Sequence, residues 1–183
     1  RADPQIGVLA DVNKDGVLDV ITSTYSSGPV QVINGASGQH MTGYDSLNAP
    51  THSPNSVYDI DLDGNLEILV CRNSEVSVFD LTTKSLDVIL PYSAGEPPLM
   101  ADVIGDSRLE ILLASWSWNI GIVIYDSTYT QVGQIPRGSS RWTLVQDIDN
   151  DGQNELIFTD SSSLVAYDTS AYAPMPKVRT NML

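Results

Sequence analysis

Residues 59–67 read Asp59-Ile60-Asp61-Leu62-Asp63-Gly64-Asn65-Leu66-Glu67, and this acidic stretch decides the fold because it recurs along the chain. Similar stretches occupy residues 11–19, 102–110 and 147–155, so the four copies begin 43 to 48 residues apart. We name them loop 1 (11–19), loop 2 (59–67), loop 3 (102–110) and loop 4 (147–155). Self-similarity at this period is typical of repeat architectures.

The residue types in these loops suit a hard cation. Loops 1, 2 and 4 carry side-chain oxygens at loop positions 1, 3, 5 and 9 and a glycine at position 6. Calcium prefers such oxygens, and glycine permits the sharp turn between them. Loop 3 has Ile104, Ser107 and Arg108 at positions 3, 6 and 7. We therefore expect loop 3 to be empty, with the Arg108 guanidinium either beside Asp106 or Glu110 or in solvent.

Strand-like segments surround each loop. An apolar run follows every loop directly, at residues 20–22, 68–70, 111–113 and 156–158, as expected for strands covered on both faces. A second β-type run then ends in an Asn or Asp that can start a turn, namely Asn34, Asp80, Asp126 and Asp168. Polar segments such as 86–90 and 131–135 supply a further strand, and the segments 5–10, 56–58, 99–101 and 143–145 supply the first one. Four strands per repeat is the pattern of a propeller blade.

The sequence thus predicts an all-β fold, a β-propeller of four four-stranded blades in a single domain over residues 1–183. The expected blades cover residues 1–49, 50–92, 93–136 and 137–183. Four blades can close a small ring, or they can form part of a larger propeller or of an assembly completed by a partner. Because the chain begins at Arg1, we expect a processed product or a piece of a longer polypeptide.

Composition narrows the function classes. The chain has 183 residues, 42% of them hydrophobic and 17% charged, which argues against disorder. Its net charge of -14 is mostly local, because 14 of the 23 acidic residues lie in the four loops. The nine Lys and Arg residues form no basic stripe, which argues against nucleic acid as a partner. No apolar stretch approaches the roughly 20 residues of a membrane span. The single cysteine, Cys71, is expected to be buried.

The repeated Asp-x-Asp-x-Asp-Gly-x-x-Asp/Glu loop with its following apolar strand resembles the FG-GAP and VCBS repeats of integrin α-subunit-type β-propellers. The resemblance covers essentially the whole chain. It implies calcium in the turn between the first two strands of a blade and a secreted or cell-surface protein. Members of this family are mostly adhesive or structural, and some are polysaccharide lyases. The Phe-Gly and Gly-Ala-Pro signatures do not occur here, so integrin-like ligand recognition is not expected.

The resemblance implies three calcium sites, each with four side chains and one main-chain carbonyl at position 7. The implied ligands are Asp11, Asn13, Asp15, Val17 and Asp19 in loop 1, Asp59, Asp61, Asp63, Asn65 and Glu67 in loop 2, and Asp147, Asp149, Asp151, Gln153 and Glu155 in loop 4. An EF-hand would need a glutamate at position 12 between helices, but Thr22, Val70 and Phe158 stand there in β-type runs. Acidic hairpins that are merely solvated remain the alternative.

Catalytic patterns are scarce. The chain has no Gly-x-Ser-x-Gly elbow, no phosphate-binding glycine loop and no His-Glu-x-x-His helix, and its two histidines, His40 and His52, lack a second ligand nearby. The expected function is therefore a non-catalytic, calcium-stabilised extracellular module for adhesion, scaffolding or assembly. The alternatives are a glycan-binding or glycan-cleaving fragment of a polysaccharide lyase, and a repeating subunit of an extracellular fibre.

Aromatic residues offer a candidate surface for recognition. They are Trp116, Trp118, Trp142, Tyr25, Tyr44 and Tyr92. Exposed Trp and Tyr can stack on sugars or anchor a protein partner, whereas packing between blades would bury them. The expected partners are thus a protein or a glycan at an extracellular surface, and self-association is a further option.

Overall fold

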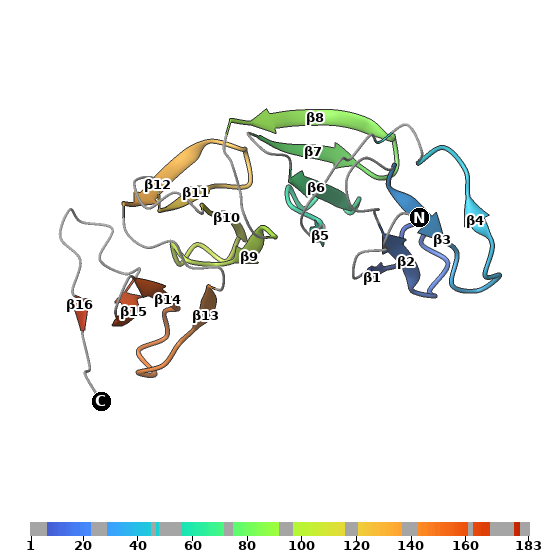
Figure 1. Ribbon diagram of the computed structural model, residues 1–183. Helices are drawn as coiled ribbons and strands as arrows, with labels where there is room; N and C mark the ends of the chain where they lie inside the picture. Colours follow the sequence, from blue (N-terminus) through green and yellow to red (C-terminus); the bar gives the residue numbers. More distant parts are fainter. Residues whose placement is uncertain are drawn as a thin grey trace. The chain divides into compact units, whose positions relative to one another are not determined.

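The computed structural model describes most of the repeated segments of the chain. The described residues are 7–22, 29–44, 47, 56–71, 75–91, 97–115, 121–136, 143–160, 163–168 and 178–179. All regular elements among them are β-strands, and Figure 1 shows them coloured along the sequence. The prediction of an all-β fold is therefore confirmed.

Among the described residues, sixteen strands form four sheets of four strands each. The first sheet contains β1 (Val8–Ala10), β2 (Asp19–Thr22), β3 (Gln31–Ile33) and β4 (His40–Met41). The second contains β5 (Ser56–Tyr58), β6 (Glu67–Cys71), β7 (Val76–Asp80) and β8 (Ser85–Leu90). The third contains β9 (Leu99–Ala101), β10 (Glu110–Ala114), β11 (Ile122–Tyr125) and β12 (Gln131–Ile135). The fourth contains β13 (Leu144–Gln146), β14 (Glu155–Asp160), β15 (Ser163–Asp168) and β16 (Val178–Arg179).

Each sheet is an antiparallel meander in which strands adjacent in sequence pair with one another. In every sheet one acidic loop connects the first strand to the second, because β2, β6, β10 and β14 begin at position 9 of loops 1 to 4. Each of the four residue ranges expected for the blades contains the strands of one sheet. The sheets therefore have the strand order of propeller blades, and loop position 9 stands at a fixed place in each.

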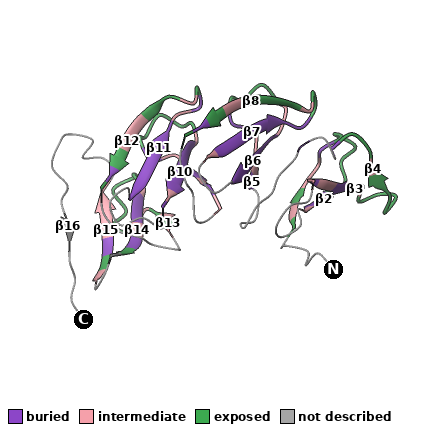
Figure 2. Cartoon of the chain, turned by 45° about the horizontal axis from the view of Figure 1, so that its top comes forward, coloured by how far each residue is buried: buried purple, intermediate pink, exposed green. Residues whose placement is uncertain are grey.

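The second and third strands are the most buried. All residues of β6 and β7 are buried, as are all those of β11, whereas β4, β8 and β12 carry many exposed residues. Figure 2 shows this gradient in purple and green. Continuous apolar runs suit strands that are covered on both faces. This explains why the apolar runs of the sequence form the second and third strands of the sheets.

The chain divides into two compact units, Arg1–Pro98 and Leu99–Leu183. In the first unit, a core joins the first and second sheets and includes Ile21, Val32, Ile68 and Val70. In the second unit, a core joins the third and fourth sheets and includes Leu112, Leu156 and Phe158. Sheets thus pack in pairs within each unit, and a single domain over 1–183 stays a prediction.

The structure contains no candidate membrane-spanning helix within the residues that it describes.

Candidate metal centres

The four loops share one backbone conformation. Positions 4 and 6 have positive φ in every loop, with values of 59, 63, 79 and 59° at position 4 (Lys14, Leu62, Gly105, Asn150) and 84, 87, 68 and 90° at position 6 (Gly16, Gly64, Ser107, Gly152). Left-handed backbone favours glycine, and loop 3 carries its glycine at position 4 in place of position 6. The sequence change at Ser107 therefore leaves the turn of loop 3 intact.

The loops also share three hydrogen bonds. The position-2 N–H donates to the position-9 carboxylate over 3.0, 2.7, 2.7 and 2.8 Å in loops 1 to 4. The position-6 N–H donates to the position-1 carboxylate over 2.8, 3.1, 2.9 and 3.1 Å. The position-7 N–H donates to the position-5 carboxylate over 2.8, 2.7, 2.9 and 2.9 Å. Each loop is thus held in shape by its own amides, and its acidic side chains turn inward.

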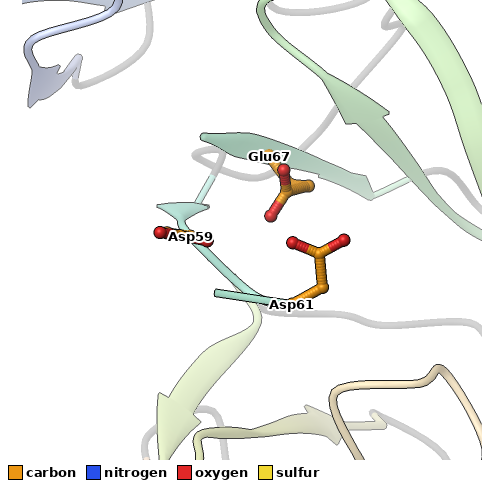
Figure 3. Close-up of side chains that lie close together, drawn as sticks. All are labelled: Asp59, Asp61 and Glu67. Atoms are coloured by element: carbon orange, nitrogen blue, oxygen red, sulfur yellow. The ribbon is translucent and has the colours of Figure 1, made fainter. Parts of the chain in front are cut away.

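Three of the loops bring carboxylates together. Ligand oxygens of Asp59, Asp61 and Glu67 all lie within 4.8 Å of one another, and the same holds in loops 3 and 4. Figure 3 shows the carboxyl groups of Asp61 and Glu67 facing each other beside Asp59. The corresponding groups are Asp102, Asp106 and Glu110 in loop 3 and Asp147, Asp149 and Glu155 in loop 4. Like charges at this spacing repel unless a cation or a proton intervenes.

Buried oxygens without hydrogen-bond partners test whether a cation fits. Four such oxygens belong to the three clusters, at Asp59 Oδ1 in loop 2, Glu110 Oε1 in loop 3, and Asp147 Oδ1 and Glu155 Oε1 in loop 4. A buried carboxylate oxygen without a partner is costly, and oxygen donors of this kind are what calcium requires. The residues of loops 2, 3 and 4 therefore fit a divalent cation.

Loop 1 differs from the other three. All six carboxylate oxygens of Asp11, Asp15 and Asp19 accept hydrogen bonds from the protein. By the criterion of unpartnered oxygens, loop 1 does not fit a cation, although its sequence predicted a site. Loop 3, which was expected to be empty, thus gathers a carboxylate cluster, and loop 1, which was expected to hold an ion, gathers none.

Burial changes the proton affinity of two clustered glutamates. Burial and, less strongly, the charges of Asp61, Asp59 and Asp63 raise the pKa of Glu67 to about 7, although the hydrogen bond from Ile60 N–H lowers it. Burial also raises the pKa of Glu110, again against hydrogen bonds from the loop amides. Both side chains are almost fully buried. The cation-free form of these loops therefore holds carboxylates under electrostatic strain.

Several implied ligands lie outside the clusters. Asp63 and Asp151 at position 5 accept the N–H of Asn65 and Gln153, and Asp63 Oδ2 also accepts the Asn65 amide over 2.9 Å. Val17 makes the equivalent bond to Asp15 in loop 1. In loops 2 and 4 the clusters therefore use positions 1, 3 and 9, and in loop 3 they use positions 1, 5 and 9.

The positive charge of Arg108 influences Asp126, a residue that the sequence did not suggest as its partner. Its main-chain N–H donates to Asp106 over 2.9 Å, but its charge acts on Asp126. Burial opposes ionisation of Asp126, yet hydrogen bonds from Thr128 and Thr130 together with the Arg108 charge hold its pKa below the usual range. The side chain thus contributes positive charge at the turn after β11.

Two side chains connect neighbouring loops within a unit, and loop sequence alone did not reveal them. Lys14 of loop 1 donates to Asn65 Oδ1 of loop 2 over 3.0 Å. Asn154 of loop 4 donates to the main-chain oxygen of Asp102 in loop 3 over 2.8 Å. Position-4 and position-8 residues vary between the repeats, so only the folded sheets could show these contacts.

The other predicted positions divide into two groups. Tyr44 is 4% exposed and belongs to the core of the first unit, which corrects its place among the candidate recognition residues, and His40 is an exposed residue of β4. The remaining positions lie outside the described residues, namely Trp116, Trp118, Trp142, Tyr25, Tyr92 and His52.

Solved structures resemble this chain in fold, and two examples give the extent of the likeness. The crystal structure of the V. cholerae biofilm matrix protein Bap1 aligns with a TM-score of 0.64 at 22% identity, over 90% of this chain and 29% of that chain. A crystal structure of BBS1N in complex with ARL6DN aligns with a TM-score of 0.57 at 15% identity, over 94% of this chain and 51% of that chain. The likeness at these identities concerns the fold, and the chain spans about a third to a half of the length of these neighbours.

No family model matches the chain, and no curated protein matches it.

Proposed function

We propose that this chain is a non-catalytic, calcium-stabilised β-propeller module, of the FG-GAP and VCBS type, that serves adhesion, scaffolding or assembly outside the cell. The four antiparallel four-stranded sheets support the propeller, because their strand order is that of blades. The fold likeness to a biofilm matrix protein is compatible with an extracellular role.

The observation that carries the proposal is the set of unpartnered buried oxygens in the carboxylate clusters of loops 2, 3 and 4. The ligands in these loops would be Asp59, Asp61 and Glu67, Asp102, Asp106 and Glu110, and Asp147, Asp149 and Glu155. A bound calcium ion supplies the positive charge that these oxygens lack. Calcium fits better than magnesium because calcium accepts six to eight oxygen ligands in varied geometry, whereas magnesium demands a nearly ideal octahedron.

The clusters stand where they can stabilise the fold. Position 9 begins the buried second strand of each sheet, and position 1 follows the first strand, so a cation held between them joins two strands. A ligand bound only by the folded state adds roughly 1 to 3 kcal/mol per site at about 10 to 100 times Kd. Three such contributions are large beside a typical folding free energy of about 5 to 15 kcal/mol. Sites of modest affinity suffice in the millimolar calcium found outside cells.

Loop 3 should be the weakest of the three sites. Its position 3 is Ile104, which offers no oxygen, so one ligand fewer is available than in loops 2 and 4. The Arg108 charge beside the loop further opposes a cation. We therefore expect two tighter ions and one weaker ion per chain.

Calcium stoichiometry and thermal stability test the proposal. Native mass spectrometry and isothermal titration should detect three calcium ions, and chelation should lower the unfolding temperature by several degrees. Asp59→Asn and Asp147→Asn should each remove one ion, whereas Glu75→Gln, which makes the same charge change outside the loops, should remove none. A protein that binds no calcium, or that melts identically with and without chelator, would overturn the calcium role.

A second assay tests the non-catalytic role. The purified protein is incubated in calcium with acidic polysaccharides, and both retention of the polymer and release of new chain ends are measured. Retention without turnover is the expected result for a binding or scaffolding module. Turnover that disappears in Arg141→Ala or His52→Ala would establish a polysaccharide lyase instead.

A further inference from the structure

Loop 1 matches the cation-loop pattern in sequence, yet its acidic side chains find donors inside the protein. Asp11 accepts the N–H groups of Asp15 and Gly16 over 3.0 and 2.8 Å. Asp19, which is fully buried at position 9, accepts Val12 N–H through Oδ2 and Gly35 N–H through Oδ1, over 3.0 and 2.9 Å. The oxygens that would coordinate a cation are thus already satisfied.

The side-chain amide of Asn34 lies between the middle and the last aspartate of this loop, Asp15 and Asp19. Its Nδ2 is 3.2 Å from Asp19 Oδ1 and 3.3 Å from Asp15 Oδ2. A primary amide carries two N–H groups, so one nitrogen can bridge the position-5 and position-9 carboxylates. The nitrogen therefore occupies the junction that a cation would otherwise neutralise.

The orientation of this amide is set by its other end. Asn34 Oδ1 accepts hydrogen bonds from the main-chain N–H and from the Oγ–H of Ser37 over 2.8 and 2.7 Å. Turning the amide over to offer its oxygen to a cation would break both bonds and would point N–H groups at donors. The hydrogen bonds from Ser37 thus keep the Nδ2 group of Asn34 directed at loop 1 as a hydrogen-bond donor.

The other three sheets have a carboxylate where the first sheet has this amide. Glu67 pairs across the strands with Asp80, and Glu155 pairs with Asp168, while Asp19 and Asn34 stand one step beyond the pair Val20–Ile33. Asp80 Oδ1 accepts Thr82 and Thr83 N–H groups, so it starts the same turn as Asn34 Oδ1. The remaining side-chain atom is an oxygen in Asp80 and a nitrogen in Asn34. A glutamate facing an aspartate needs positive charge, whereas an aspartate facing an asparagine does not.

We infer that the Asn34 side-chain amide closes loop 1 in place of a divalent cation, so that the first sheet folds without calcium although its loop carries the calcium motif. The contrast with loops 2, 3 and 4 rests on the proposed function, but the hydrogen bonds of loop 1 do not depend on it. One residue across the sheet, and not the loop itself, then decides whether a repeat takes an ion.

The test compares position-1 variants and an Asn34 variant of the full chain. Asp11→Asn in loop 1 should leave the number of bound calcium ions unchanged by native mass spectrometry, while Asp59→Asn at the same position of loop 2, a member of its carboxylate cluster, should remove one ion. Asn34→Asp, which replaces the donor by a carboxylate of the same shape, should add one ion. Loss of an ion in Asp11→Asn, or an unchanged count in Asn34→Asp, would overturn the inference.

A measurement in chelator separates this inference from the proposed function. Without calcium, Asn34→Asp should lower the urea midpoint, because three carboxylates then face one another at the junction, and calcium should restore the midpoint. An unchanged midpoint in chelator would refute the bridging role of Asn34 even if loops 2, 3 and 4 bind calcium. Conversely, a wild-type protein without any bound calcium refutes the proposed function, and the chelator measurement still decides the role of Asn34.

Discussion

The ammonium nitrogen of Lys84 lies 4.4 Å from the centre of the Tyr44 ring, a cation–π contact between the second and first sheets. The same nitrogen donates to the main-chain oxygen of Thr42 over 3.1 Å. Lys84 ends the turn between β7 and β8, and Tyr44 belongs to the core shared by these two sheets. Lys84, in the turn that joins β7 to β8, therefore connects the two neighbouring sheets.

Lys84→Met should lower the free energy of unfolding by about 1 kcal/mol, because the apolar stem remains while the cation–π contact and the hydrogen bond are lost. Urea unfolding in saturating calcium measures this change. A double-mutant cycle with Tyr44→Leu should give a coupling of about 0.5 to 1 kcal/mol. Lys84→Arg, which keeps the charge, is the control, and fully additive effects would show that the two residues do not interact.

Gly35→Ala should destabilise the protein by roughly 2 kcal/mol or more, because an added Cβ would lie 2.0 Å from the main-chain oxygen of Leu18. The backbone would have to move, and the Gly35 N–H bond to Asp19 would weaken. Gly38→Ala in the same turn is the control, since no atom lies within 4 Å of its added Cβ and only its φ of +67° opposes alanine. Gly38→Ala should cost about 1 kcal/mol. Equal melting temperatures for the two variants would contradict the steric argument.

Most of the strand pattern could be predicted from the sequence, because local signals decide it. Apolar runs such as Ile68–Val70, the Asx residues that start turns and the acidic loops all recur at one period, so each repeat supports the others. The glycine at position 6 of loops 1, 2 and 4 also predicts the turn of each loop, since glycine favours left-handed backbone. Loop 3 keeps that turn although Ser107 stands at position 6, where its φ is 68°.

The hydrogen-bond partners of the loop carboxylates could not be predicted in the same way, because some of them lie outside the loops. The number of side-chain oxygens in each loop predicts a cation in loop 1 and none in loop 3. That number takes no account of Asn34, which lies 15 residues after Asp19 and donates to it. The contact joins the position-9 residue to the Asx residue that starts the turn after the third strand, here Asp19 to Asn34. Predicting it requires the register of the second and third strands, which the loop sequence alone does not give.

Ile104→Asp should tighten the weakest site, because it adds the position-3 oxygen that loop 3 lacks. Ile104 is 37% exposed, so its replacement removes little packing. Isothermal titration calorimetry with calcium should resolve three binding steps. The weakest step should become about tenfold tighter, which corresponds to a gain of about 1.4 kcal/mol in binding free energy. Ile104→Asn tests whether a neutral side-chain oxygen suffices at this position. An unchanged third step would mean that loop 3 binds no ion.

Glu67→Gln should stabilise the calcium-free protein above neutral pH, because it removes a buried carboxylate whose pKa is raised to about 7. A raised folded-state pKa means that the fold favours the protonated glutamate. Its contribution is therefore fully present below about pH 4.5 and is lost as the pH rises through about 7. Wild type and variant should have similar stability near pH 4.5, and the variant should be more stable by about 1 to 3 kcal/mol at pH 8. Urea unfolding in metal-free buffer at several pH values measures this difference.

In saturating calcium, the same Glu67→Gln substitution should have the opposite effect. Glu67 belongs to the loop 2 cluster with Asp59 and Asp61, so the neutral variant binds the ion less tightly and gains less stability from it. At pH 8 the wild type should then be the more stable protein by about 1 to 3 kcal/mol, the order reversed from metal-free buffer. A reversed order of stability requires that the Glu67 carboxylate destabilises the protein without calcium and binds the ion when calcium is present. If Glu67→Gln were destabilising by the same amount in both buffers, Glu67 would be a structural hydrogen-bond acceptor for Ile60 N–H and not a calcium ligand.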